Sequence, residues 1–143
     1  LDLKGLYLAN IKNGAIGNQK QIPVNFLVHP NELAVVTADS LSQIQTYPMS
    51  VPGRFIQMSL PSYNTDSSTV FLLKDSTSIL DRVSYSAKWH LKLIADVKAK
   101  SLEKIDPFGA SNDKKNWHTA AEAVGFATPG APNFPCSPPR SGR

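Results

Sequence analysis

The stretch VFLLKDSTSILDRVSY, residues 70–85, decides the fold class that this sequence predicts. Its first five residues are almost continuously apolar and rich in β-formers, which is typical of a buried strand. The polar residues 75–77 (DST) then supply a turn. Residues 79–85 follow at once, and two strands joined by so short a link usually pair antiparallel. The stretch therefore predicts a β-hairpin.

More strands are expected upstream of this hairpin. Residues 22–28 (IPVNFLV) place an apolar side chain at every second position, the period of a strand with one buried face. Pro23 has no backbone N–H, so it belongs at the start of that strand or on an edge. An Asn-Gly and a Gly-Asn pair within residues 13–18 predict a polar turn region. The expected upstream strands cover residues 3–10, 22–28, 33–38 and 55–60.

Helices are expected to contribute little. Pro48, Pro52 and Gly53 argue against a long helix in residues 39–54, although residues 40–46 have room for a single helical turn. Residues 64–68 are polar and predict a hairpin-like loop. Six short strands at regular spacing in the first 86 residues indicate an all-β sandwich or barrel. The missing long helical pattern disfavours a doubly wound fold.

The last third of the chain is less regular. Residues 91–95 form a short apolar patch, and residues 101–105 predict a seventh strand that Asp106-Pro107 ends. A short helix over residues 117–124 is expected, capped by Asn112 or Asp113 and ended by Gly125. From residue 128 the chain is rich in proline. We expect one domain over residues 1–133 and a flexible proline-rich tail at residues 134–143.

Composition places the chain among ordinary globular domains. It has 143 residues, enough for one domain with a core that needs no metal or disulfide. Hydrophobic residues make up 41% and charged residues 18%, which excludes a disordered class. No run of eighteen apolar residues exists, so no membrane span is expected. The start, LDLKGLYLAN, lacks the pattern of a signal peptide.

The charge is mildly basic. A net charge of +4 and a pI near 9.3 allow weak attraction to nucleic acid or anionic surfaces. The basic residues are spread along the chain, however, which is more typical of a solvated surface. The single cysteine, Cys136, has no partner for an internal disulfide or a multi-cysteine zinc site. Cysteine usage therefore does not identify the redox compartment.

No catalytic signature is present. The sequence has no nucleophile elbow, P-loop, dinucleotide fingerprint, H-E-x-x-H or EF-hand loop, so we expect no enzyme activity, catalytic residue or cofactor. His90 and His118 each follow a tryptophan and, with Asp106 and Asp113, are the candidates for a metal site. The favoured interpretation is that both Trp-His pairs hold irregular loops, the tryptophan filling core and the histidine bonding backbone. Glu103 and Asp106 are expected to pair with lysines or to cap a turn.

Turn chemistry accounts for two other polar groups. Residues 111–113 (SND) are interpreted as a turn or cap, because short polar side chains hold backbone N–H groups. Residues 128–130 (TPG) are interpreted as a turn that closes the domain. The tyrosines and both tryptophans are interpreted as core, with a sugar-stacking platform as the alternative.

Six blocks carry a resemblance to a known family. They are DLKGLYLAN (2–10), ELAVVTAD (32–39), WH (89–90), SLEKIDP (101–107), SNDKKNWH (111–118) and ATPGAPN (127–133). In this order and spacing they resemble the bacterial version of the lamin tail domain, over nearly the whole chain. Within SLEKIDP (101–107), Lys104 stands where the family usually has arginine.

The resemblance implies an immunoglobulin-like antiparallel β-sandwich with a long irregular C-terminal segment. Bacterial members occur in extracytoplasmic, secreted or cell-surface proteins, where the domain binds or positions and does not catalyse. Family members usually have one or two strands upstream of the D-L-x-G strand, so the N-terminal strand or strands are expected to lie outside this chain, or else an open edge invites strand addition. The structural motif residues carried over are Trp89, His90, Asp106, Pro107, Ser111, Asp113, Trp117, His118, Pro129 and Gly130.

The functional expectation is an interaction or spacer module of a larger, extracytoplasmic bacterial protein. Its partner would be another protein, a neighbouring domain, or a second copy paired through the open sheet edge. The candidate exposed binding residues are Trp89, His90, Trp117 and His118. Carbohydrate or cell-surface binding, motivated by the aromatic residues, and weak nucleic-acid binding, motivated by the basic excess, remain alternatives.

Overall fold

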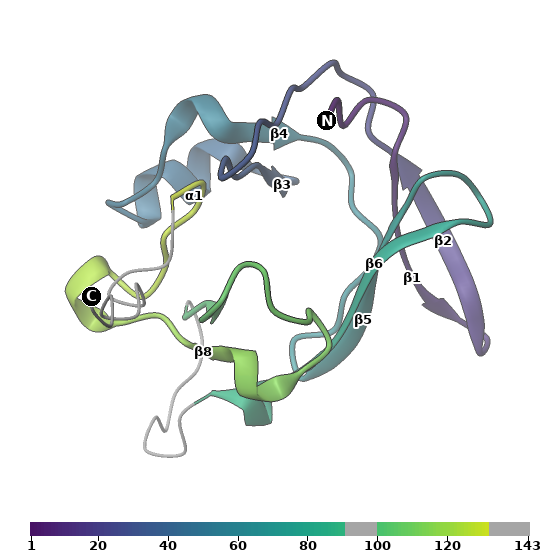
Figure 1. Cartoon of the computed structure of the whole chain (residues 1–143). Coiled ribbons are helices and arrows are strands. Elements are labelled where there is room, and N and C mark those ends of the chain that lie inside the picture. The colour runs from purple at the N-terminus through teal and green to yellow at the C-terminus, as the bar shows by residue number, and fades with distance from the viewer. Residues whose placement is uncertain (91–99, 132–143) are drawn as a thin grey trace.

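The computed structural model describes residues 1–90 and 100–131 (Figure 1). The predicted apolar patch at 91–95, the domain end at 133 and the tail at 134–143 lie outside these residues. The protein is β-rich with one short α-helix, as predicted, and three small sheets carry the strands. The strands are β1 (Tyr7–Lys12), β2 (Ala15–Gln21), β3 (Val35–Thr37), β4 (Phe55–Gln57), β5 (Ser67–Leu73), β6 (Ile79–Ser86), β7 (Leu102–Lys104) and β8 (Trp117–Thr119).

The predicted hairpin at residues 70–85 is confirmed as β5 and β6, which pair antiparallel. β5 begins at Ser67, so the last two residues of the expected loop 64–68 belong to the strand. Its burial alternates, with Phe71 and Leu73 buried and Val70 half-buried, because β5 is a central strand with different cover on its two faces. In the turn, the Asp75 carboxylate accepts hydrogen bonds from Thr77 and from Ser78, which lowers the pKa of Asp75.

β1 and β2 form a second hairpin, and the sheet order is β2-β1-β5-β6. The turn is Asn13-Gly14, both with positive φ, as a two-residue hairpin turn requires. The expected turn region 13–18 is therefore wrong beyond Gly14, because residues 15–21 form a strand. This strand (AIGNQKQ) lies on a sheet edge with most side chains exposed, so it shows no apolar alternation in sequence.

The expected strand at 22–28 is wrong. Beyond β2 the chain runs beside residues 1–6 and exchanges five backbone hydrogen bonds with them, but these form no regular ladder and leave Asp2 and Leu27 as an isolated bridge. The Asp2 carboxylate accepts hydrogen bonds from the backbone N–H groups of Lys4 and Phe26, so it replaces part of a regular ladder. These bonds also lower the pKa of Asp2. The apolar alternation still marks burial at Ile22, which is 2% exposed.

The expected strands at 33–38 and 55–60 are present but shorter, as β3 and β4. They pair parallel, which departs from a purely antiparallel fold. Residues 40–46, which have room for a single helical turn, form the seven-residue helix α1 (Ser40–Thr46), and it lies in the connection that a parallel pair needs. Asp39 caps it by accepting a hydrogen bond from the Ser42 N–H.

The seventh strand is confirmed as β7, and it pairs antiparallel with β8. The expected helix over 117–124 is wrong: its first residues form β8, and only a 3-10 turn, Glu122–Val124, follows. Gly125 does end that turn in the left-handed conformation. Asp113 caps a different 3-10 turn, Lys114–Asn116, by accepting from the Lys115 N–H.

Two small apolar clusters form the core. One gathers Leu3, Leu6, Ile22 and Ile56, and the other gathers Ala9, Phe71 and Leu73. In Figure 1 the four-stranded sheet lies on the right, while α1, β3 and β4 lie at the upper left and β8 below them. Within the described residues, no helix is long and apolar enough to cross a membrane.

Candidate functional site

The two Trp-His pairs meet in space. Trp89 ends a 3-10 turn, Ala87–Trp89, that follows β6, and Trp117 begins β8. Their ring centroids lie 6.3 Å apart with the planes at 37°. The Trp117 indole N–H donates to the Ser111 carbonyl at 2.8 Å. Trp89, His90, Trp117 and His118 are each half-buried and not fully exposed.

The His90 ring is linked to a side chain of β8. Its Nδ1 lies 2.9 Å from the Thr119 hydroxyl, and Thr119 is only 3% exposed. Burial, with a smaller effect from Lys100, lowers the pKa of His90. Burial therefore favours the uncharged ring, which acts as a hydrogen-bonding partner within the fold.

The SND segment covers the outer edge of β6. The Ser111 hydroxyl donates to the Asp81 carboxylate at 2.6 Å. The Asn112 side-chain oxygen accepts the Ser84 backbone N–H at 2.7 Å. A side chain thus takes the place of a neighbouring strand at this N–H.

Asp106 and Pro107 belong to a turn at residues 105–110 that Asn116 holds. The Asn116 side chain accepts the Asp106 N–H at 2.8 Å and donates to the Asp106 carbonyl at 2.9 Å. The Lys104 ammonium donates to the Gly109 carbonyl at 2.9 Å. A Cβ at Gly109 would lie 2.6 Å from Asn116 Nδ2, so only glycine fits there without displacing Asn116. At the tip, the Phe108 side chain is 85% exposed.

Glu103 fastens β7 to the closing segment 127–130. One of its carboxylate oxygens accepts from the Thr128 N–H at 2.7 Å, from the Thr128 hydroxyl at 2.8 Å and from Ser101 at 2.9 Å. Its other oxygen is buried without a hydrogen-bond partner. The expected pairing of Glu103 with a lysine is replaced by these bonds, while Asp106 caps its turn by accepting from the Phe108 N–H.

Pro129 and Gly130 continue the closing segment toward α1. The Pro129 carbonyl accepts the Val51 N–H at 3.0 Å. Gly130 has a φ of 78°, and a Cβ there would lie 3.0 Å from the Arg54 Cβ. These contacts connect the C-terminal third to the loop after α1.

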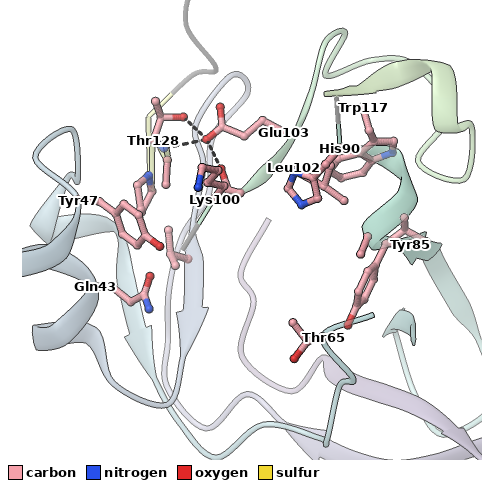
Figure 2. Close-up of a pocket in the computed structure, with 16 residues that line it drawn as sticks. Gln43, Tyr47, Thr65, Tyr85, His90, Lys100, Leu102, Glu103, Trp117 and Thr128 are labelled. Atoms are coloured by element: carbon pink, nitrogen blue, oxygen red, sulfur yellow. Dashed lines mark hydrogen bonds between the residues drawn. The ribbon is translucent and has the colours of Figure 1, made fainter. Parts of the chain in front are cut away.

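A hollow of about 530 Å³ lies among β6, β7, β8 and α1. Figure 2 shows Tyr47 and Tyr85 on its opposite sides, with His90 and Leu102 between them. Burial raises the pKa of Tyr85, whose hydroxyl donates to the Asn64 carbonyl. The hollow thus combines aromatic walls with a set of polar and ionisable side chains, among them His90, Lys100 and Glu103.

A second, smaller recess lies beside Trp89. It has a volume of about 410 Å³ and is lined by Ser86, Lys88, Trp89, Lys114 and Lys115. Sequence reasoning treated these lysines as a dispersed surface, because residues 88 and 114 are far apart in the chain. The structure brings them together through the contact between the two tryptophans.

Metal binding by the candidate residues gains no support from this geometry. Among residues 1–90 and 100–131, no group of three or more histidine, cysteine, aspartate or glutamate side chains is close enough to hold a metal ion. Asp106 and Asp113 instead accept backbone N–H groups in their own turns.

Comparison with known proteins adds no relative. The chain matches no protein-family model, no curated protein and no solved structure. The likeness to the lamin tail domain therefore rests on the sequence blocks quoted above.

Proposed function

We propose that this chain is a non-catalytic interaction module, an immunoglobulin-like domain of the lamin tail type within a larger extracytoplasmic bacterial protein. It presents the loop at residues 105–110 to a protein partner or a neighbouring domain. The observation that carries the proposal is the exposure of Phe108, 85% of whose side chain faces solvent at the tip of a firmly held turn.

The loop is suited to binding because hydrogen bonds hold its backbone in place without a partner. Asn116 bonds both the N–H and the carbonyl of Asp106, and Lys104 bonds the carbonyl of Gly109. A loop whose backbone is already held loses little conformational freedom on binding, and burying an aromatic side chain contributes roughly 1.5–3 kcal/mol. Aromatic anchors of this kind dominate the binding energy of many interfaces.

A non-catalytic role fits the engagement of the acid–base groups around the hollow. The Glu103 carboxylate accepts three hydrogen bonds from Ser101 and Thr128, and His90 bonds Thr119. These side chains hold segments together, so using them to move protons during catalysis would loosen the fold.

The test places a photo-crosslinking phenylalanine analogue at position 108 of the full-length protein in its own cells. The same analogue at Leu41, which is 63% exposed on α1, is the matched control. We expect one discrete crosslinked product from position 108, none from position 41, and loss of the product when Gly109→Ala displaces the loop. Identical crosslinking patterns from both positions, or none from position 108, would refute the proposal.

Carbohydrate binding is a second candidate, favoured by the hollow. Tyr47, Tyr85 and Trp117 line it, and aromatic faces stack against sugar rings. A glycan array probed with the wild-type chain, Tyr85→Phe and Tyr85→Ala tests this function. Binding that survives in Tyr85→Phe and is lost in Tyr85→Ala supports a sugar site, whereas an array blank for all three removes it.

A further inference from the structure

The recess beside Trp89 concentrates positive charge. Lys88 lies on the turn after β6, and Lys114 and Lys115 lie on the turn before β8. Within the part of the chain that the structure describes, none of these three ammonium groups is ion-paired with a carboxylate. Three like charges around one recess repel each other, and a bound anion relieves that repulsion.

Two carboxylates in the segments that carry these lysines accept hydrogen bonds from other groups. Asp113 accepts the backbone N–H of Lys115 at 3.0 Å, and Asp81 accepts the hydroxyl of Ser111 at 2.6 Å. The described residues that line the recess include three lysines and no carboxylate, so the recess is positively charged.

Trp89 supplies an aromatic ring to the lining of the recess. Its ring contacts that of Trp117, whose indole N–H is bonded to Ser111. Trp89 is the one aromatic residue among the described residues that line the recess. One aromatic surface next to several cations suits a ligand with one ring and an acidic group.

We propose that this recess binds an anionic sugar unit, a ring of hexose size that carries a carboxylate, sulfate or phosphate. The volume of about 410 Å³ accommodates a unit of that size. Single-stranded nucleic acid is disfavoured because its binding sites stack successive bases on several aromatic side chains along a basic groove. This site is separate from the Phe108 loop, so it goes beyond the proposed protein partner.

The test measures binding by calorimetry at low salt to the full chain. The probes are a galacturonate tetramer, glucose 6-phosphate and glucose 6-sulfate, with glucose as the neutral analogue. Inorganic phosphate and a short thymidine oligonucleotide complete the set. The site variant replaces Lys88, Lys114 and Lys115 by Gln. The control variant replaces Lys12, Lys20 and Lys74 by Gln, which removes the same charge from exposed positions on the β1–β2 and β5–β6 hairpins.

We expect at least one acidic sugar to bind, glucose not to bind, and higher salt to weaken the interaction. The site variant lowers the affinity by about tenfold or more, as loss of roughly 1.4 kcal/mol would, and the control variant changes it by less than about threefold. Trp89→Phe retains most of the affinity and Trp89→Ala does not. Circular dichroism melting confirms that every variant is folded.

Several results would overturn the proposal. Equal losses in the site and control variants would show that only net charge matters. Inorganic phosphate bound as tightly as the sugar phosphate would show a simple anion site. Tighter binding of the oligonucleotide than of every sugar would assign the recess to nucleic acid, and no binding of any acidic sugar would exclude the site.

Discussion

At the scale of single residues, Glu103 shows how one side chain joins distant parts of the chain. Its carboxylate receives both hydrogen-bond donors of Thr128, a residue that is only 6% exposed. In the sequence, Glu103 is one acidic residue beside a lysine, and nothing local indicates that its partner lies 25 positions ahead. The structure assigns it to closing the domain.

Glu103→Ala tests this role. The substitution leaves the Thr128 N–H and hydroxyl buried without their acceptor, so we expect a loss of about 2–4 kcal/mol in the free energy of unfolding. Chemical denaturation of Glu103→Ala, Thr128→Val and the double variant measures the coupling between the two residues. The losses should be less than additive, since each single change already breaks the contact. A loss below about 0.5 kcal/mol for Glu103→Ala would contradict the assigned role.

His90 makes the stability of the folded protein depend on pH. Because its pKa is lowered in the folded state, the unfolded chain binds more protons below the ordinary histidine pKa of about 6.5. The stability linked to His90 is therefore present above that pH and is lost as the pH falls toward the lower folded-state pKa. Asp2, Glu32 and Asp75 also have lowered pKa values, but their contributions are lost only in the more acidic carboxylate range.

The measurement compares urea unfolding at about pH 7.5 and about pH 5.5, on either side of the ordinary histidine pKa. The wild-type chain should lose stability at the lower pH, and His90→Asn should lose less, since its amide retains a hydrogen bond to Thr119 without titrating. The same pH dependence in both proteins would assign the effect to another group.

At the scale of secondary-structure elements, the β1–β2 hairpin depends on its turn. Asn13 and Gly14 both have a positive backbone φ, which residues other than glycine and asparagine rarely adopt. Gly14→Ala should cost about 1 kcal/mol, although a Cβ there meets no other atom within 4 Å. Gly53→Ala is the matched control, because Gly53 is equally unobstructed but has no positive φ. Thermal unfolding of both variants measures the difference, and equal effects would argue against backbone strain at Gly14.

The edge of β6 is protected by side chains and not by a strand. Asn112 accepts the Ser84 N–H, and Ser111 bonds Asp81. Replacing both Ser111 and Asn112 by Ala exposes this edge, and we expect self-association to increase because open strand edges pair with one another. Size-exclusion chromatography with light scattering over a range of concentrations measures the oligomeric state. An unchanged mass distribution would show that the edge is blocked by other means.

At the scale of the whole molecule, the closing segment unites the parts. Residues 127–130 bond β7 through Glu103 and bond the loop after α1 through Val51. Among the described residues, the two apolar clusters lie in the first part of the chain, and the C-terminal part adds the buried residues Ala120, Val124 and Ala127. Domains of this size are stable by only about 5–15 kcal/mol, and loss of one such segment is therefore costly.

Two truncations test the importance of the closing segment. A chain that ends at Phe126 loses the buried Ala127 and Thr128 together with their hydrogen bonds, and we expect it to unfold at a clearly lower temperature or to be unfolded outright. A chain that ends at Asn133 removes only the segment that the sequence predicts to be a flexible tail, and its melting temperature should match that of the full chain. Equal melting temperatures for the two truncated chains would contradict the closing role.

The sequence by itself determined the β-rich class, the β5–β6 hairpin and the strand β7, and it left room for the short helix α1. Each depends on signals within a few neighbouring residues, such as apolar runs, turn residues and caps. Tertiary structure alone decided that the polar residues 15–21 form an edge strand. It also decided that residues 117–119 pair with β7 and do not begin a helix, since strand pairing is satisfied by partners distant in sequence. The Glu103–Thr128 contact and the lysine recess beside Trp89 arise for the same reason, because folding juxtaposes residues that no local pattern relates.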